Sequence, residues 1–333
     1  MNAMGIAGYD IIGDVHGCAK SLEILLVKLG YENCAKQGLW PSYSHSSRKA
    51  IFLGDIVDRG PRIREALHIV KNMVDAGTAE CILGNHEINA LGYTTKAPES
   101  SDKTYVREHN TRHNRLIAET LNQFAGFPEE WRMFLTWFQS LPVYRDYNDF
   151  RAVHACWDSE LITEFSQRYP GKHNIDSAFI EKSAFPHSFE HKFLDRLTRG
   201  TDLSLPEGRK MTGHDGVVRR AFRTKFWADE PETFRDVVFQ PDPLPEDISS
   251  LPLNPEQKSS LLSYGDEQVP VFVGHYWLQG EPEPIKDNLA CLDYSAVKYG
   301  RLACYRFDGE AKLHKSKFTW VDVTPDLNTP MPR

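Results

Sequence analysis

The first ninety residues alternate between short apolar runs and longer amphipathic stretches. The apolar runs cover residues 9–12, 50–53 and 81–83, and each one leads into a polar cluster that begins with glycine. Runs of this length, bounded by glycine, are typical of buried β-strands. Between them, apolar residues recur at helical spacing over residues 22–29 and 66–74, and a glycine follows each stretch. The pattern predicts parallel strands that are connected by crossover helices.

The polar clusters fall at the carboxyl ends of these predicted strands. They are Gly13-Asp14-Val15-His16-Gly17, Gly54-Asp55-Ile56-Val57-Asp58-Arg59-Gly60 and Gly84-Asn85-His86-Glu87. The carboxyl ends of parallel strands meet at one edge of a sheet, where α/β proteins carry their sites. We therefore expect the three clusters to lie together.

The remainder of the chain is less regular. Residues 92–147 form a polar segment that we predict to be a helical insertion, and residues 157–268 predict an irregular lobe over the site. Two further apolar runs end in His154 and His275, and the tail returns to strand-like runs. We predict a single domain over residues 5–325 that carries these two insertions.

Six oxygen or nitrogen donors stand at the ends of predicted strands, and we interpret them as metal ligands. One Asp or His at a strand end is usually a cap, but several clusters in one order favour a metal site. Oxygen ligands mixed with imidazole suit Mn, with Fe, Zn and Mg as alternatives. Asp55 could bridge two divalent ions, and a water between the ions would become hydroxide at neutral pH. The donors are Asp14 and His16 for the first ion and Asn85, His154 and His275 for the second.

Composition narrows the classes of partner. The chain is 41% hydrophobic and 26% charged, with a formal net charge of −7, so no long-range attraction draws it to nucleic acid or an anionic membrane. No apolar run approaches the roughly 20 residues of a membrane span. We see no secretion signal and expect a cytoplasmic protein, whose oligomeric state the sequence leaves open. The expected partner is a phosphorylated small molecule or a phosphoprotein.

The same clusters resemble the signature of the calcineurin-like metallophosphoesterases. The motifs are Asp14-x-His16, Gly54-Asp55-x-x-Asp58-Arg59-Gly60 and Gly84-Asn85-His86-Glu87. Their form is similar to the branch of phosphoprotein phosphatases and bacterial diadenosine tetraphosphatases. This resemblance implies an α/β fold of four layers, in which two mixed sheets pack face to face between helices. It also implies the ligand set given above.

The resemblance also implies roles for three residues near the ligands. His86 would be the general acid that protonates the leaving oxygen, and Asp58 would orient it and favour its protonated form. Arg59 would grip a phosphate oxygen, because a guanidinium fork matches phosphate geometry. We expect Glu87 to brace the loop instead of taking part in the reaction.

Two arginine-containing segments bear on the substrate. Protein phosphatases usually have two glycines after the first late histidine, whereas Ala155 and Cys156 follow His154 here. A second phosphate-binding arginine is therefore hard to align; Arg223 is our candidate, and a solvated face is an equal alternative for its segment.

The other segment is basic and follows the third cluster. On one helix, its arginines would share a side and could hold the distal phosphates of a nucleotide. An exposed helix face without a ligand is the alternative interpretation. The arginines are Arg107, Arg112 and Arg115.

These observations predict a dinuclear-metal phosphoesterase in which activated water attacks phosphorus directly. Its substrates would be phosphomonoesters or phosphoanhydrides, including dinucleoside polyphosphates. A protein serine/threonine phosphatase is the first alternative, and a metal-binding regulatory protein with little catalysis is the second. An open groove in the lobe would suit a protein chain, whereas a closed pocket with an aromatic wall would suit a nucleotide.

Overall fold

The larger of two main sheets contains the three predicted N-terminal strands. The computed structural model describes residues 6–212, 218–239 and 244–327. In this sheet β1 pairs in parallel with β4, and β4 pairs in parallel with β5, so the predicted parallel arrangement is confirmed. Antiparallel strands extend the sheet on the other side of β1. The six strands are β1 (Gly8–Ile12), β4 (Arg48–Phe52), β5 (Ala79–Cys81), β14 (Asp293–Tyr294), β15 (Arg301–Phe307) and β16 (Phe318–Asp322).

The second main sheet is mixed and has the order β13-β12-β7-β6. Its strands are β6 (Tyr144–Asp146), β7 (Arg151–Val153), β12 (Val271–Val273) and β13 (Leu289–Cys291). Alternation along β1 and β4 sends Ile11 and Ile51 into a core that also contains Phe150 and Phe272 from the second sheet. The two sheets therefore pack face to face across this core.

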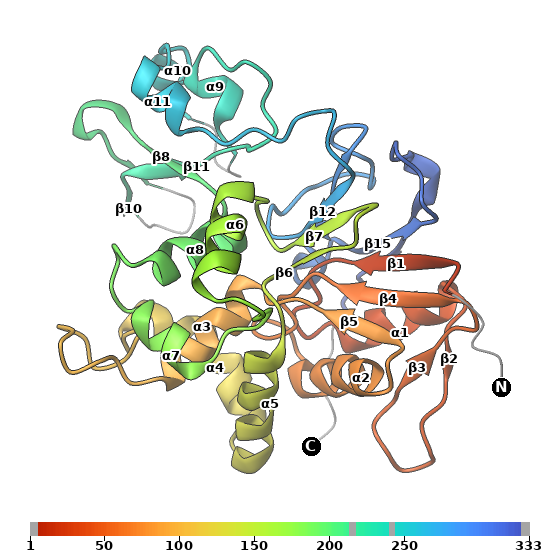
Figure 1. Cartoon of the computed structure of the whole chain (residues 1–333). Helices are drawn as coiled ribbons and strands as arrows, with labels where there is room; N and C mark the ends of the chain where they lie inside the picture. The colour runs from red at the N-terminus through yellow and green to blue at the C-terminus, as the bar shows by residue number, and fades with distance from the viewer. Residues whose placement is uncertain (1–5, 213–217, 240–243, 328–333) are drawn as a thin grey trace.

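Helices cover the outer face of each sheet. On the first sheet lie α1 (Ala19–Lys28) and α2 (Ile63–Asp75), as the apolar spacing predicted. Near the second sheet lie α6 (Ser159–Arg168) and α8 (Phe189–Arg199), whose Phe165 and Phe193 rings contact Tyr144 of β6. Figure 1 shows β7 and β12 on the opposite side of β1 and β4 from α2. The predicted four-layer fold with two mixed sheets is thus confirmed.

The segment after the third cluster contains three helices. They are α3 (Asn85–Thr94), α4 (Thr111–Phe124) and α5 (Pro128–Ser140), whose Trp131, Phe134 and Phe138 are buried. Our placement of Arg107 on one helix with Arg112 and Arg115 is wrong, because α4 begins only at Thr111. Arg107 lies before the helix, and its backbone N–H bonds to the Gly92 carbonyl at the end of α3.

The lobe of residues 157–268 has a small hydrophobic cluster of its own, which includes Leu203, Phe222, Phe234 and Ile248. Figure 1 shows β8 and β11 with the short helices α9 to α11 at one end of the molecule, away from β1. Residues 213–217 and 240–243 of this lobe lie outside the described residues. Its other elements are α7 (Ser177–Lys182), β8 (Asp202–Ser204), β9 (Met211–Thr212), β10 (Val218–Arg219), β11 (Ala221–Arg223), α9 (Phe234–Val237), α10 (Glu246–Ser249) and α11 (Pro255–Ser260).

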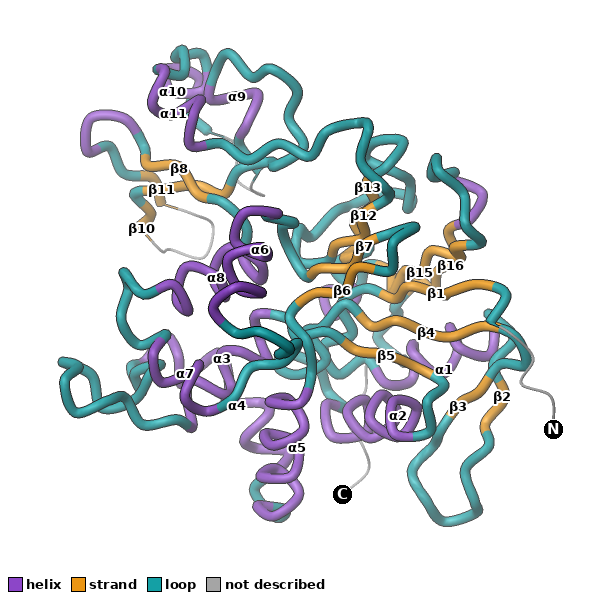
Figure 2. Tube along the Cα trace, in the orientation of Figure 1, coloured by secondary structure: helices purple, strands orange, loops and turns teal. Residues whose placement is uncertain are grey.

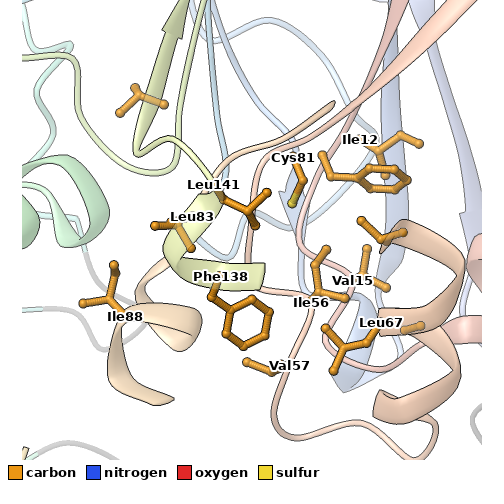
Figure 3. Close-up of a cluster of buried hydrophobic side chains, with 14 of the residues drawn as sticks. Ile12, Val15, Ile56, Val57, Leu67, Cys81, Leu83, Ile88, Phe138 and Leu141 are labelled. Atoms are coloured by element: carbon orange, nitrogen blue, oxygen red, sulfur yellow. The ribbon is translucent and has the colours of Figure 1, made fainter. Parts of the chain in front are cut away.

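The turns that carry the polar clusters rest on buried apolar side chains. Val15, Ile56 and Val57 belong to the same hydrophobic cluster as Leu83 and Phe138, and Figure 3 shows them close together. Long loops connect many of the elements, as Figure 2 shows, and a hairpin of β2 (Glu32–Asn33) and β3 (Tyr43–Ser44) follows α1. Within the described residues, we find no helix with the length and apolarity of a bilayer span.

Candidate metal centre

The three N-terminal turns are tied to one another by backbone contacts. The N–H groups of Val15 and His16 donate to the Asp55 carbonyl at 3.2 and 2.8 Å. Gly84 must be glycine, because a Cβ there would lie 2.2 Å from the Asp55 Oδ1 atom. His16 and Asp55 have φ values of 41° and 51°, which residues other than glycine rarely adopt. Such strain persists where the surrounding structure over-determines it, and it clusters at functional sites.

Glu87 joins two of these turns, as predicted. Its buried carboxylate accepts hydrogen bonds from the backbone N–H groups of Asp55, Ile56, Val57 and Gly84 at 2.8 to 3.2 Å. Burial, followed by repulsion from Asp55, raises the pKa of Glu87 above its ordinary value. The bracing interpretation of Glu87 is confirmed, because all of these contacts are to backbone.

His16 and His154 are both oriented so that one ring nitrogen faces Asp55. Each Nδ1 atom is engaged by a backbone carbonyl, that of Val57 at 2.8 Å for His16 and that of Leu53 at 2.7 Å for His154. Each Nε2 atom then lies 3.5 or 3.4 Å from the Asp55 Oδ2 atom. Such contacts on the second ring nitrogen commonly fix the orientation of a metal-binding histidine.

Two three-donor groups share the Asp55 carboxylate. One group is His16, Asp55 and His86, and the other is Asp55, His154 and His275, with ligand atoms within 4.8 Å of one another in each. The Asn85 Oδ1 atom lies 3.2 Å from the His154 Nε2 atom. The His275 Nε2 atom is buried and has no hydrogen-bond partner among the described residues. A buried polar atom without a partner is costly, and a metal ion would satisfy it.

Asp14 lies beside this centre but outside both groups. Its carboxylate accepts from the His275 N–H at 3.3 Å, and it packs against Gly274. Burial and the nearby Asp293 carboxylate raise its pKa well above the ordinary value. A divalent ion would relieve this repulsion, so Asp14 fits a metal ligand, although its assignment to the first ion stays a prediction.

Burial and neighbouring charges shift the pKa values of two other donors, His154 and His275. Although burial opposes it, the Asp55 carboxylate raises the pKa of His154 to about 10. Burial lowers the pKa of His275 well below its ordinary value, and the neighbouring Arg223 guanidinium lowers it further. Neutral imidazoles bind metals, so binding at His154 would release a proton.

His86 is held beside the centre by the predicted aspartate. Its Nδ1 atom lies 2.6 Å from the Asp58 Oδ2 atom, and its Nε2 atom faces Asp55 at 3.9 Å. The other oxygen of Asp58 accepts from the Thr120 hydroxyl, and the Asp58 N–H donates to the same hydroxyl at 3.1 Å. Thr120 belongs to α4, so a helix distant in sequence holds the His86–Asp58 pair.

The structure brings Arg59 and Arg223 to opposite sides of the centre. The Arg59 guanidinium donates to the Nε2 atoms of His16 and His86 at 3.0 Å each. Arg223 is half-buried at the end of β11, and its Nη1 atom lies 3.4 Å from the His275 carbonyl. Arg223 therefore lies beside a proposed metal ligand, and its role in binding phosphate stays a prediction.

Arg107 lies at a cavity of about 390 Å³ next to the centre. Burial, followed by the neighbouring Arg199, lowers the pKa of Arg107 to about 10. No described residue gives the Arg107 guanidinium a hydrogen bond or an ion pair. Arg112 and Arg115 are exposed on α4 and do not line this cavity.

Sequence reasoning missed residues whose role depends on tertiary contacts. Thr120 and Arg199 lie within helices whose sequence gives no sign of the site. Trp277 had one local signal, since it stands two residues after His275 at the end of a strand. Its ring lies 5.0 Å from the Arg59 guanidinium carbon.

The site consists of buried carboxylates and imidazoles at the ends of strands in two face-to-face sheets. This arrangement is typical of metal-dependent phosphoesterases. The chain belongs to the calcineurin-like phosphoesterase family, whose model matches residues 9–275. The resemblance noted from the sequence motifs is thereby confirmed.

The chain is similar to bacterial bis(5'-nucleosyl)-tetraphosphatases. It is 49% identical to the asymmetrical enzyme PrpE of Oceanobacillus iheyensis over 162 residues, which are 48% of this chain and 60% of that protein. The match thus spans only about three-fifths of that relative. The symmetrical enzyme of Vibrio campbellii is 28% identical over 303 residues, with 90% of this chain and 94% of that protein covered.

Solved structures that align with the chain include phosphatases that act on proteins. A protein serine/threonine phosphatase from Saccharomyces cerevisiae aligns with a TM-score of 0.48 and 14% identity, covering 100% of this chain and 82% of that one. A cold-active protein-tyrosine phosphatase from a Shewanella species aligns with a TM-score of 0.46 and 18% identity, covering 97% and 83%. At these values the likeness carries no argument about activity.

Proposed function

We propose that this chain is a dinuclear-metal phosphoesterase that hydrolyses phosphoanhydrides of the dinucleoside polyphosphate class. One observation carries the proposal. Two buried donor groups share Asp55; near them lie Arg223, whose contact with the His275 carbonyl is long at 3.4 Å, and Arg107, whose guanidinium has no hydrogen bond or ion pair among the described residues. Metal ligands alone would suit any phosphate ester. Cations that extend away from the centre favour a substrate with more than one phosphate.

The residues that would hold the two ions are Asp14, His16, Asp55, Asn85, His154 and His275, with Asp55 shared. Mn is the metal that we propose, because carboxylate, amide and imidazole donors are mixed. When bound, such ions polarise the phosphoryl oxygens and activate water for direct attack on phosphorus. No covalent intermediate with the protein is needed.

The protein's own groups would then handle charge and the leaving proton. Once Arg59 has turned away and Nε2 is protonated, His86 would donate that proton to the leaving oxygen, while Asp58 holds the ring through Nδ1 at 2.6 Å. Arg59 shares the Nε2 atoms of His16 and His86 in this structure, and we propose that it turns to a phosphate oxygen when substrate enters. Arg223 would bind the phosphate from the other side.

The distal phosphates would lie toward the cationic cavity. Arg199 and Arg107 are close enough that Arg199 lowers the pKa of Arg107, and Arg199 also lowers that of His275. Arg199 therefore lies near both His275 and Arg107, and Arg107 lines the cavity. Arg107 is the best candidate of our three basic residues, because it is half-buried and its guanidinium has no hydrogen bond or ion pair among the described residues. Arg112 could add longer-range attraction, and Arg115 is the least placed to do so.

A substrate screen tests this proposal. Purified protein loaded with Mn would be assayed with diadenosine tetraphosphate, inorganic tripolyphosphate, p-nitrophenyl phosphate and a phosphothreonine peptide. We expect the highest kcat/KM for diadenosine tetraphosphate. A preference for the phosphopeptide would instead support the serine/threonine phosphatase alternative. No turnover of any substrate, with metal still bound, would support a regulatory role.

A further inference from the structure

A second cavity is lined by Trp277, whose ring contacts the Arg59 guanidinium beside the metal centre. Its volume is about 390 Å³, and it lies between the segment after β12 and the segment after β14. Its lining includes Trp277, Tyr294, Ser295, Lys298 and Tyr299. We propose that this cavity, called the Trp277 cavity, binds the nucleoside next to the phosphate under attack. The inference rests on the proposed function and deepens it.

The wall of the cavity offers aromatic surface to solvent. Tyr299 is 58% exposed, although large apolar side chains are usually buried, and Trp277 is half-buried. Exposed aromatic rings in a concave site are a typical platform on which bases stack. Trp277 is also directly connected to the phosphate-binding group, because its ring centre lies 5.0 Å from the Arg59 guanidinium carbon. A base stacked here would place its attached phosphate near Arg59.

The backbone of this wall is held in conformations that residues other than glycine rarely adopt. Trp277, Ser295 and Tyr299 have φ values of 32°, 58° and 61°, in the left-handed region that favours glycine. Such a strained residue persists where the surrounding structure over-determines it. The Asp293 carboxylate provides that support, since it accepts from the Trp277 N–H at 3.1 Å and the Ser295 N–H at 2.9 Å. One buried carboxylate therefore fixes both sides of the cavity.

Lys298 covers the ring in the present structure. Its Nζ atom lies 3.6 Å from the Trp277 ring centre, and the residue is exposed. An exposed cation–π contact is weaker than the stacking of a base on an aromatic ring. A nucleobase can therefore displace the ammonium group, which is then free to meet the ribose or a phosphate. The net result is an aromatic platform with a cation at its rim, which is the chemistry that a nucleotide requires.

Binding of adenosine tests the inference without any hydrolysis, because adenosine has no phosphate ester. Equilibrium dialysis with labelled adenosine would compare the Mn-loaded wild type with Trp277→Leu, Trp277→Phe and Trp40→Leu. Trp40 is a matched control, since it is half-buried and lies under the Arg64 guanidinium at 5.3 Å, outside the site. We expect Trp277→Leu to weaken binding about 5- to 100-fold, and Trp277→Phe to restore most of it. The Trp40 variant should bind like the wild type.

Photolabelling with 8-azidoadenosine supplies a second readout that does not depend on affinity. The expected label lies on peptides that contain Trp277 or residues 294–299. Equal adenosine binding by wild type and Trp277→Leu, or labelling confined to other peptides, would overturn the inference. If adenosine binds through Trp277 but diadenosine tetraphosphate is not cleaved, the proposed function fails and the cavity stands. If cleavage occurs without any dependence of adenosine binding on Trp277, the cavity assignment fails alone.

Discussion

The N-terminal strand–helix region, residues 8–94, and the outer segments, residues 95–147 and 157–268, contribute to the site in different ways. In the N-terminal region every donor follows a strand within a few residues, and Glu87 ties the turns together through backbone N–H groups. In the outer segments Thr120, Arg199 and Arg223 reach the site from unrelated helices and strands. The N-terminal region supplies four of the six proposed donors, and the outer segments supply side chains that surround the centre.

This difference suggests a division of labour in the reaction. Buried donors with fixed ring orientations suit bond breaking, because a small error in position lowers the rate of that step. Long cationic side chains on irregular segments suit recognition of groups beyond the scissile bond. Substitutions in the N-terminal region should therefore change kcat for every substrate. Substitutions in the outer segments should change KM for polyphosphates more than for simple esters.

The largest effect is expected from Asp55→Asn. Asp55 is the carboxylate that both three-donor groups share, so its loss should weaken both ions together. We expect loss of most bound metal and a fall in kcat of at least about a thousandfold on all substrates. Metal analysis after dialysis, alongside steady-state assays, measures this. Two equivalents of metal retained by the variant would contradict a bridging role.

His86→Asn should come next. General acid catalysis contributes about 10²- to 10⁴-fold, so kcat should fall by that factor on alkyl phosphates, whose leaving groups are poor. The loss should be smaller on p-nitrophenyl phosphate, whose leaving group needs little protonation. Parallel assays of the two substrates decide the matter. Equal losses would mean that His86 positions other groups instead of donating a proton.

Glu87→Gln should act on stability. The amide group of Gln would face backbone N–H groups that now donate to a carboxylate, leaving buried donors unpaired. We expect the free energy of unfolding to fall by roughly 2–4 kcal/mol. Denaturant titration measures it, with Glu160→Gln as an exposed control expected to shift by under about 0.5 kcal/mol. If the Glu87→Gln variant is as stable as the control, Glu87 is not what links the turns.

Arg223→Met tests whether the lobe of residues 157–268 contributes to substrate binding. Arg223 lies 3.4 Å from the His275 carbonyl, so the substitution removes a guanidinium from one side of the phosphate position. A charge-assisted contact is worth about 1.5–3 kcal/mol, so KM should rise roughly ten- to a hundredfold for phosphate substrates. Metal content should not change. Loss of metal from the variant would instead show that Arg223 supports His275.

The smallest effect is expected from Arg107→Ala. KM for diadenosine tetraphosphate should rise about tenfold, because Arg107 is half-buried and has no partner in the described part of the chain. KM for p-nitrophenyl phosphate should stay constant. The exposed Arg115→Ala is the matched control, and the triple Ala variant with Arg112 should add little. Assays at fixed ionic strength exclude screening effects. Equal responses to both substrates would break the proposed division.

Local sequence predicted the centre because each proposed donor follows an apolar strand closely in the chain, and most of them lie in turns that contain glycine. The ends of β1, β4 and β5 and the brace Glu87 could be predicted in that way, and the six donors stay the ligand set that we propose. The family resemblance added the four-layer packing and the pairing of His86 with Asp58.

Only the tertiary structure decided the surroundings of the centre. Arg107 lies before α4 instead of on it, Thr120 reaches Asp58 across 62 positions, and Trp277 meets Arg59 from another sheet. No periodicity encodes such contacts, because they depend on how separate elements pack and on which long side chains are left without partners. The sequence by itself therefore determined where the metal donors gather, and the packing of distant elements decided which cations and rings surround them.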